Sequence, residues 1–345
     1  MTEIDEAGVR AGRPVPRPTI KDVAALAGVS IKTVSRVINS EPRVSPATTQ
    51  AVRAAITELG FRRNDGARIL RQGYSATLGL VLEDFGDPFY SVLTDAVAQL
   101  VHREGYTLLT GSSAEDSVRE RELVLNFCAR RVDGLIVVPT AGQHDYLLPE
   151  IKAGVAAVFV DRPAGDLDAD TVLSDNVAGV RAGVDHLISY GHRRIGFLGD
   201  RPDIFTAAER LAGYRAALAA AGLTVDESLI DMAPPQPPAI RDALTRMLTG
   251  PDPATALFTG NSRITVGVLR ELPGYGRRPA LVGFDDFELA DLLAPGVTVV
   301  AQDPVAMGQT AAQLLLRRLS GDRGPARRIS HATTLVPRGS GETRP

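Results

Sequence analysis

Charged and amide side chains stand directly after several apolar runs of this 345-residue chain, where they could hold a small ligand. Asp161 and Arg162 follow residues 156–160, and Asp285 follows residues 280–284. Such groups recognise hydroxyl groups by hydrogen bonds, and aromatic rings stack on the apolar face of a sugar. The residues that offer this chemistry are Phe89, Tyr90, Asp161, Arg162, Arg210, Asn261, Asp285 and Gln302.

Several of these residues have simpler alternative roles. Asp161 and Arg162 can pair with each other, and Asp285 can cap a following helix. Arg210, on a helix, can form an ordinary surface salt bridge. Asp161 and Asp285 together are also the residue types that a glycosidase uses as paired carboxylates. For Asp161, Arg210 and Asp285 a ligand contact is the favoured interpretation.

From residue 78 onward, apolar runs alternate with amphipathic segments. This alternation predicts an α/β body of doubly wound parallel sheets, and about 270 residues exceed one such sheet, which predicts two lobes. The expected strands are 78–82, 106–110, 134–138, 156–160, 194–198, 256–259 and 280–284, and the expected helices include 89–104, 177–190 and 206–221. Ligands of such folds bind at the carboxyl ends of strands, where the polar residues above lie.

The segment before this body predicts three short helices in an all-α head. Thr19 is a candidate N-cap of the first helix, Ser30 of the second and Ser45 of the third. Gly28 permits the sharp turn between the first two helices, so that they form a helix-turn-helix. The outward face of the second helix carries Ile31, Lys32, Thr33, Ser35, Arg36 and Asn39.

The charge distribution favours a polyanionic partner for the head alone. Residues 1–73 hold 12 Lys and Arg against 7 Asp and Glu, whereas the rest of the chain has an excess of acidic residues. Lys32 and Arg36 are one helical turn apart, so both side chains could enter one major groove of DNA. The alternative is a solvated polar face on an ordinary three-helix bundle.

Composition excludes several other classes of protein. The single cysteine, Cys128, allows no internal disulfide, and no apolar run is long enough to span a membrane. The first 17 residues lack a secretory signal, so a cytoplasmic protein is expected. Dinucleotide, P-loop and His-Glu-x-x-His motifs do not occur, so we expect no cofactor, no metal and no enzyme, and we interpret His192 as a turn or surface residue.

The head resembles the LacI/GalR family of transcriptional regulators. The resemblance rests on residues 19–30 (TIKDVAALAGVS), 33–39 (TVSRVIN), 43–45 (RVS), 59–61 (LGF) and 64–73 (NDGARILRQG). It implies that Ile31, Lys32 and Arg36 read bases, and that phosphates are contacted by Thr19, Ser30, Thr33, Ser35 and Asn39. It further implies a hinge over residues 64–72, including Asn64 and Arg68, in which Leu70 wedges into the minor groove.

The body resembles the same family, whose two lobes are similar to periplasmic sugar-binding proteins and close around an effector. The matching runs are 84–90, 158–163, 190–196, 209–214, 260–261, 283–286 and 302–303. They imply that the residues given first above are effector contacts, and they add Asp87. Ser262 and the proline-rich loop 233–238 depart from the family pattern, so a non-sugar or an unusually small ligand stays an alternative to a sugar or sugar derivative.

The resulting hypothesis is a dimeric repressor that binds a palindromic operator in double-stranded DNA and responds to a small-molecule effector. Its expected parts are a disordered arm (1–17), the helix-turn-helix domain (18–62), a hinge (63–75), an effector-binding and dimerisation domain (76–340) and a tail (341–345). Lobe one is expected near 76–173 plus 304–331, and lobe two near 174–301 plus 332–340. A solute-binding protein would fit the body but not the head.

Overall fold

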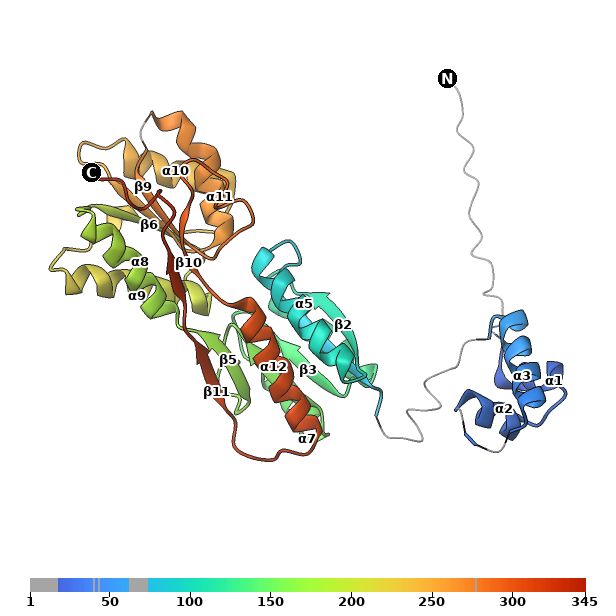
Figure 1. The fold of residues 1–345 in the computed structure, drawn as a ribbon. Coiled ribbons are helices and arrows are strands. Elements are labelled where there is room, and N and C mark those ends of the chain that lie inside the picture. Colours follow the sequence, from blue (N-terminus) through green and yellow to red (C-terminus); the bar gives the residue numbers. More distant parts are fainter. Residues whose placement is uncertain (1–17, 40, 43, 62–73, 277) are drawn as a thin grey trace, which may run out of the picture. The chain divides into compact units, whose positions relative to one another are not determined.

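The computed structural model describes residues 18–39, 41–42, 44–61, 74–276 and 278–345 (Figure 1). The contacts between residues divide the chain into two units, residues 1–73 and 74–345, which are described separately.

The first unit contains the three expected helices, α1 (Ile20–Leu26), α2 (Ile31–Ile38) and α3 (Pro46–Leu59). Local hydrogen bonds explain where they begin: the Asp22 carboxylate accepts bonds from the Thr19 amide and hydroxyl. The hydroxyl oxygens of Ser30 and Ser45 accept hydrogen bonds from backbone amides in the first turns of α2 and α3. The helices bury a small shared core of Val23, Ala24, Val34, Val37, Val52 and Ala55. The helix-turn-helix prediction is therefore confirmed.

The second unit begins with a lobe built on a parallel sheet in the order β11-β5-β4-β3-β1-β2. Its strands are β1 (Thr77–Leu82), β2 (Thr107–Ser112), β3 (Gly134–Val137), β4 (Ala156–Val160), β5 (Asp170–Ser174) and β11 (Arg328–His331). Helices α5 (Pro88–Arg103) and α12 (Pro304–Leu319) share one core with the sheet, and α6 (Ser117–Ala129) and α7 (Leu148–Lys152) pack in another. We call this part lobe one.

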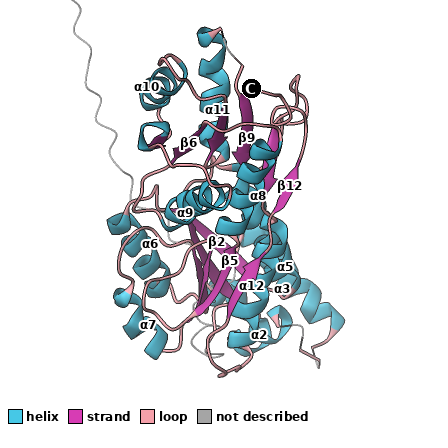
Figure 2. Cartoon of the chain, turned by 90° about the vertical axis from the view of Figure 1, so that its left-hand side faces the viewer, coloured by secondary structure: helices cyan, strands magenta, loops and turns pink. Residues whose placement is uncertain are grey.

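A second sheet, in the order β12-β10-β9-β8-β6-β7, forms lobe two, and only β12 runs antiparallel to its neighbour. The strands are β6 (Ile195–Gly199), β7 (Ile230–Met232), β8 (Ala256–Thr259), β9 (Ala280–Phe284), β10 (Thr298–Ala301) and β12 (Thr334–Val336). Helices α8 (Asn176–Ser189) and α9 (Phe205–Ala220) share one core, and α10 (Pro237–Leu248) and α11 (Ser262–Glu271) share another (Figure 2). Helices on both faces of mostly parallel sheets confirm the doubly wound prediction.

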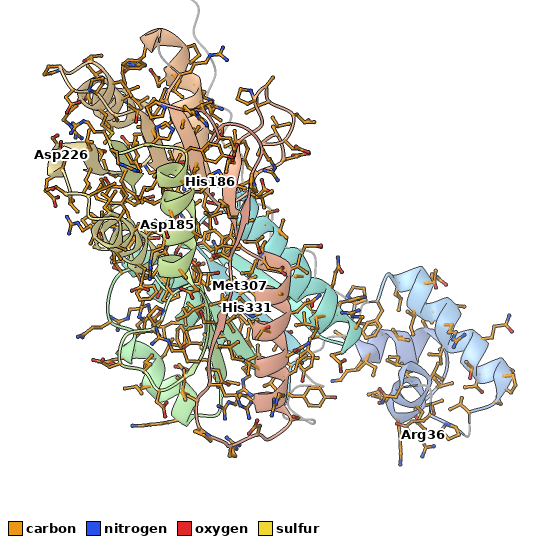
Figure 3. All side chains as sticks on the ribbon, turned by 60° about the vertical axis from the view of Figure 1, so that its left-hand side comes forward. Arg36, Asp185, His186, Asp226, Met307 and His331 are labelled. Carbon is orange, nitrogen blue, oxygen red and sulfur yellow. The ribbon has the colours of Figure 1, made fainter. Side chains whose placement is uncertain are left out.

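The chain passes between the lobes three times, after β5, after β10 and after β11. Side chains tie these crossings together: the Ser174 hydroxyl lies 3.1 Å from the Met307 sulfur, and the Thr310 hydroxyl lies 3.1 Å from Nε2 of His331 (Figure 3). The Asp175 amide also donates to the His331 carbonyl. The three crossings therefore form one connected interlobe junction between two otherwise separate sheets.

The C-terminal residues pack against lobe two, whereas the sequence predicts a simple tail there. Glu342 pairs with His186 and accepts hydrogen bonds from the Thr298 hydroxyl. His192 is fully buried and bonds to the Thr255 hydroxyl and the Thr343 carbonyl. His192 lies in the loop after the turn that ends α8, but the interpretation of it as a surface residue is wrong, because contacts with residues 63 and 151 positions away in the chain bury it.

No helix among the described residues is long and apolar enough to cross a membrane.

Glycine allows the close packing of α8 against α9. A Cβ atom on Gly213 would lie 2.7 Å from the Val177 carbonyl oxygen and 3.0 Å from the Val180 Cβ. We predict that Gly213→Ala lowers the free energy of unfolding by about 1–3 kcal/mol, because backbone must shift to admit the methyl group. Denaturant unfolding measures this change. Gly274→Ala, with open space around the added atom, is the control, and an equal loss in both variants would contradict the explanation.

Candidate DNA-binding surface and interlobe site

The outer side of α2 presents polar and charged side chains in the head. Ile31, Lys32 and Asn39 are exposed, and Thr33, Ser35 and Arg36 are partly exposed. Ser30 is exposed and also caps α2, since its hydroxyl oxygen accepts a hydrogen bond from the Thr33 amide. Thr19 is exposed and donates its hydroxyl to Asp22. The predicted hinge residues Asn64, Arg68 and Leu70 lie outside the described residues.

An acidic side chain accompanies the main cation of this surface. The Arg36 Nε lies 3.8 Å from the Glu41 carboxylate, and the Asn39 amide donates to the same carboxylate at 3.4 Å. Arg36 stays 43% exposed, and Figure 3 shows it at the edge of the head. An exposed pair of this length is weak, so Arg36 can exchange Glu41 for a base or phosphate at small cost.

A cleft of about 550 Å³, including its part open to solvent, lies between the two lobes. All nine predicted effector contacts line it: Asp87, Phe89, Tyr90, Asp161, Arg162, Arg210, Asn261, Asp285 and Gln302. Further polar residues line the cleft that are not among the predicted contacts, including Glu83, Asp200, Thr206 and Arg263. Glu83 directly follows β1 and Asp200 directly follows β6, so the strand-end pattern that found Asp161 and Asp285 could also have found these two.

In lobe one, the site is organised around Arg162, which is 4% exposed. Its Nη1 donates to Glu115 at 2.7 Å and its Nη2 donates to Glu83 at 2.7 Å. Its Nε lies 3.6 Å from the Asp161 carboxylate. The predicted pairing of these two neighbours is therefore present, but it is the longest of the three contacts between Arg162 and a carboxylate. The Tyr90 hydroxyl donates to Asp161 at 3.1 Å. Arg162 therefore has three carboxylates around one guanidinium group.

In lobe two, Arg210 is the buried arginine of the site, as Arg162 is in lobe one. It is 6% exposed, which excludes the surface salt bridge considered above. Its Nε donates to the Asn176 side chain at 2.8 Å, and its Nη1 donates to the Gly260 carbonyl at 2.7 Å. The guanidinium lies 3.9 Å from the ring centre of Phe284 and 3.6 Å from the Asp285 carboxylate. Gln302 also donates to Asp285, at 2.6 Å.

The two lobes place their key carboxylates by the same backbone device. Asp161 follows β4 and Asp285 follows β9, and both have φ of +70°. Each amide still bonds to the neighbouring strand, that of Asp161 to Val172 and that of Asp285 to Val300. Left-handed backbone is costly for a residue with a side chain, and such outliers cluster at ligand sites. The positive φ turns the chain at the end of β4 and of β9, and each carboxylate lines the cleft.

Burial raises the pKa of several carboxyl groups in the cleft. For Asp87 burial and then the charge of Asp285 raise the pKa from 3.8 to about 7. Burial also raises the pKa of Glu83, Asp200 and Asp285 from the ordinary value of such a carboxyl group. Asp87 comes from lobe one and Asp285 from lobe two, so their mutual repulsion acts across the cleft.

Three buried polar atoms at the cleft have no hydrogen-bond partner within the described structure: Asp161 Oδ1, Arg162 Nε and Gln302 Oε1. Unpaired buried polar atoms are rare in folded proteins, and a ligand is one way to satisfy them. Arg263 of α11 crosses the cleft, 3.4 Å from Glu83 and 3.6 Å from Asp84. No group of three or more metal-binding side chains occurs among the residues that the structure covers.

A two-lobed body with an interlobe cleft, joined to a helix-turn-helix head, defines the class of ligand-responsive DNA-binding regulators. Residues 19–64 match the model of bacterial regulatory proteins of the lacI family, and residues 184–341 match a periplasmic binding protein-like domain. The chain is 35% identical to the transcriptional regulator CelR of Thermobifida fusca over 340 residues, which is 94% of this chain and 98% of CelR. The chain therefore belongs to the LacI family.

Solved structures agree with this assignment. A lac repressor dimer bound to operator and an anti-inducer has a TM-score of 0.81 at 26% identity, covering 95% of this chain and all of that one. A complex of CelR with cellobiose has a TM-score of 0.68 at 34% identity, covering 94% of this chain and all of that one.

The raised pKa of Asp87 predicts a pH-dependent stability. Between pH 4 and 7 the folded protein holds a proton on Asp87 that the unfolded chain has released, so stability falls as the pH rises through this range. Above pH 7 the cost of burying the charge is fully present. Asp87→Asn removes the charge, and asparagine can still cap α5.

We therefore expect Asp87→Asn to raise the melting temperature more at pH 8 than at pH 5, by about 2–4 °C. Thermal unfolding at both pH values measures the difference. Asp95→Asn, at an exposed position of the same helix, is the control. An increase for Asp87→Asn that is the same at both pH values would contradict the buried-charge explanation.

Proposed function

We propose that this chain is a dimeric regulator of transcription, acting as a repressor, whose affinity for a palindromic operator changes when a small polyhydroxylated molecule binds between the lobes. The observation that carries the proposal is the cleft: nine contacts predicted from sequence line it, and three buried polar atoms there have no hydrogen-bond partner among the described residues. In this proposal α2 of the head contacts the major groove of the DNA, and Leu70 wedges into the minor groove.

The coupling follows from the connections between the lobes. A ligand that bonds to Asp161 in lobe one and to Asp285 in lobe two favours one relative position of the sheets. The three crossings after β5, β10 and β11 join the lobes, so a movement of lobe two on the ligand is passed on to lobe one. Because the head is attached to lobe one through residues 63–75, a change in lobe one of each protomer changes the spacing of two heads on DNA.

A regulator is also a better reading of the site than an enzyme. Asp161 is bonded to Tyr90 and lies near Arg162, and Asp285 is bonded to Gln302 and lies near Arg210. These contacts hold both carboxylates in place for recognition of a ligand.

Selection of bound fragments from a random DNA library, at two salt concentrations, tests the DNA-binding function. We expect a palindromic consensus whose binding weakens steeply as salt rises. Arg36→Ala should relax one position of each half-site and cost about 1–3 kcal/mol. Arg53→Ala, which removes an exposed cation from α3, is the matched control. Recovery of no consensus from the wild-type protein, or an asymmetric one, would overturn the dimeric operator model.

The effector function predicts a separation of the two activities. Arg210→Ala should abolish the effector response while operator affinity stays within about twofold, because Arg210 belongs to the cleft and not to the DNA-binding head. Operator binding is measured with and without sugars, starting with cellobiose. Since Arg210 is buried, Gln302→Ala serves as a second variant that removes an unpaired acceptor with less effect on packing. A wild-type response in both variants would remove the cleft from the mechanism.

A further inference from the structure

Glu41 places an acidic side chain among the residues that we expect to contact DNA, although it is not one of the predicted contacts. Its backbone amide donates to the Arg36 carbonyl at 2.9 Å, which fixes Glu41 just beyond the end of α2. This bond joins main-chain atoms, so it does not depend on the type of side chain. The Glu41 carboxylate is 51% exposed and serves no hydrophobic core. Its role is therefore to be sought in the outer side of α2.

Both oxygens of this carboxylate face side chains of α2 or its C-cap. Oε2 lies 3.8 Å from the Arg36 Nε, and Oε1 accepts a hydrogen bond from the Asn39 amide at 3.4 Å. The Asn39 amide also donates to the Ser35 hydroxyl at 3.5 Å. Ser35, Arg36 and Asn39 are all predicted DNA contacts. One carboxylate thus joins three of these contacts into a single connected group.

The contact with Glu41 occupies only one edge of the Arg36 guanidinium group. Its terminal nitrogens, Nη1 and Nη2, form no hydrogen bond with any residue that the structure describes. Guanine is read by two parallel hydrogen bonds from a guanidinium group to its O6 and N7 atoms. The terminal nitrogens can supply this pair of donors while Nε stays beside Glu41. The carboxylate therefore restricts the orientation of Arg36 and leaves its reading edge open.

The charge of Glu41 also acts on DNA whose bases are not read. A carboxylate beside a guanidinium group offsets its positive charge and repels a phosphate that approaches the pair. Non-specific binding depends almost entirely on phosphates, whereas specific binding adds contacts to base edges. Glu41 should therefore weaken non-specific binding more than it weakens binding to the operator.

The other acidic residues of the described head have different surroundings. Asp22 accepts hydrogen bonds from the amide and the hydroxyl of Thr19, and so caps α1. Glu58 is exposed near the end of α3 and forms no hydrogen bond or ion pair within residues 18–39, 41–42 and 44–61. Within these ranges, Glu41 is the acid whose carboxylate contacts side chains of the predicted DNA-binding surface.

We propose that Glu41 is a positioning residue that sets how strongly the protein discriminates between its operator and other DNA. Its carboxylate orients Arg36 toward one base of each half-site, and its charge lowers the affinity of the same surface for phosphates. Both effects raise the ratio of specific to non-specific affinity. The inference rests on the proposed reading of bases by α2.

The first test measures binding of the full-length protein to a random-sequence duplex and to a duplex of equal length with the selected operator. Glu41→Gln keeps the length of the side chain and the backbone bond to Arg36. Binding to the random duplex should become about tenfold tighter at low salt, because a dimer loses two charges that repel phosphates. The slope of log affinity against log salt should steepen by about 2, since each released Arg36 can neutralise one more phosphate. Operator affinity should change less than about threefold, because poorer orientation of Arg36 opposes the added attraction.

The second test separates positioning from charge. At the half-site position that Arg36→Ala relaxes, Glu41→Gln should lower the base preference at least about threefold. In an Arg36→Ala background it should lower that preference no further. Glu58→Gln removes the same charge from an exposed position of α3 and is the matched control. Thermal unfolding verifies that each variant keeps the fold.

An unchanged affinity of Glu41→Gln for the random duplex overturns the proposal, as does an equal gain in Glu58→Gln. A base preference that Glu41→Gln leaves intact overturns the positioning role. The proposed function fails separately, when the wild-type protein selects no consensus. Binding to the random duplex then decides alone: a gain in Glu41→Gln that Glu58→Gln lacks supports the action of Glu41 on phosphates, and its absence overturns it.

Discussion

The burial of one guanidinium group in each lobe is the constraint around which the cleft is arranged. A buried charge is costly unless it is paired and hydrogen-bonded. Arg162 meets this requirement with Glu83 and Glu115, and Arg210 meets it with Asn176, the Gly260 carbonyl and the nearby Asp285. Those carboxylates are then buried in turn, which raises the pKa of Glu83 and Asp285. The left-handed backbone at Asp161 and Asp285 is the local cost of presenting them. A ligand that completes these networks acts on charges that already hold each lobe in shape.

Glu83 connects this network to the movement of the lobes. It belongs to lobe one, where it is bonded to Arg162, and it lies 3.4 Å from Arg263 of lobe two. One carboxylate is therefore shared between an interaction inside a lobe and an interaction across the cleft. Opening the cleft breaks only the longer contact, and Arg263 is 42% exposed, so water can replace Glu83 there at small cost. This asymmetry suits a body that changes the relative position of its lobes while each lobe stays intact.

How far the structure could be predicted depends on how local its causes are. The three head helices follow from caps and periodicity within a few residues, such as Thr19 with Asp22 and Ser30 with Thr33. The central strands are continuous apolar runs, and all seven expected strands are present within one or two residues at each end. The strands β5, β7, β10, β11 and β12 were not expected, because short or polar segments such as Arg328–His331 become strands only through pairing with distant partners. His192 and Glu342 were misjudged for the same reason.

The site shows the same division between local and distant causes. A polar residue after a buried strand is visible in sequence, and this pattern is sufficient to find Asp161 and Asp285 and would have found Glu83 and Asp200. Glu115 carries no such signal, because it lies in a turn before α6 and reaches Arg162 over 47 residues of chain. The pairing state of each charge is equally invisible in sequence, yet it decides the chemistry of the cleft. An arginine beside a strand end indicates an anion site when its donors are free, whereas both terminal nitrogens of Arg162 already donate to Glu115 and Glu83.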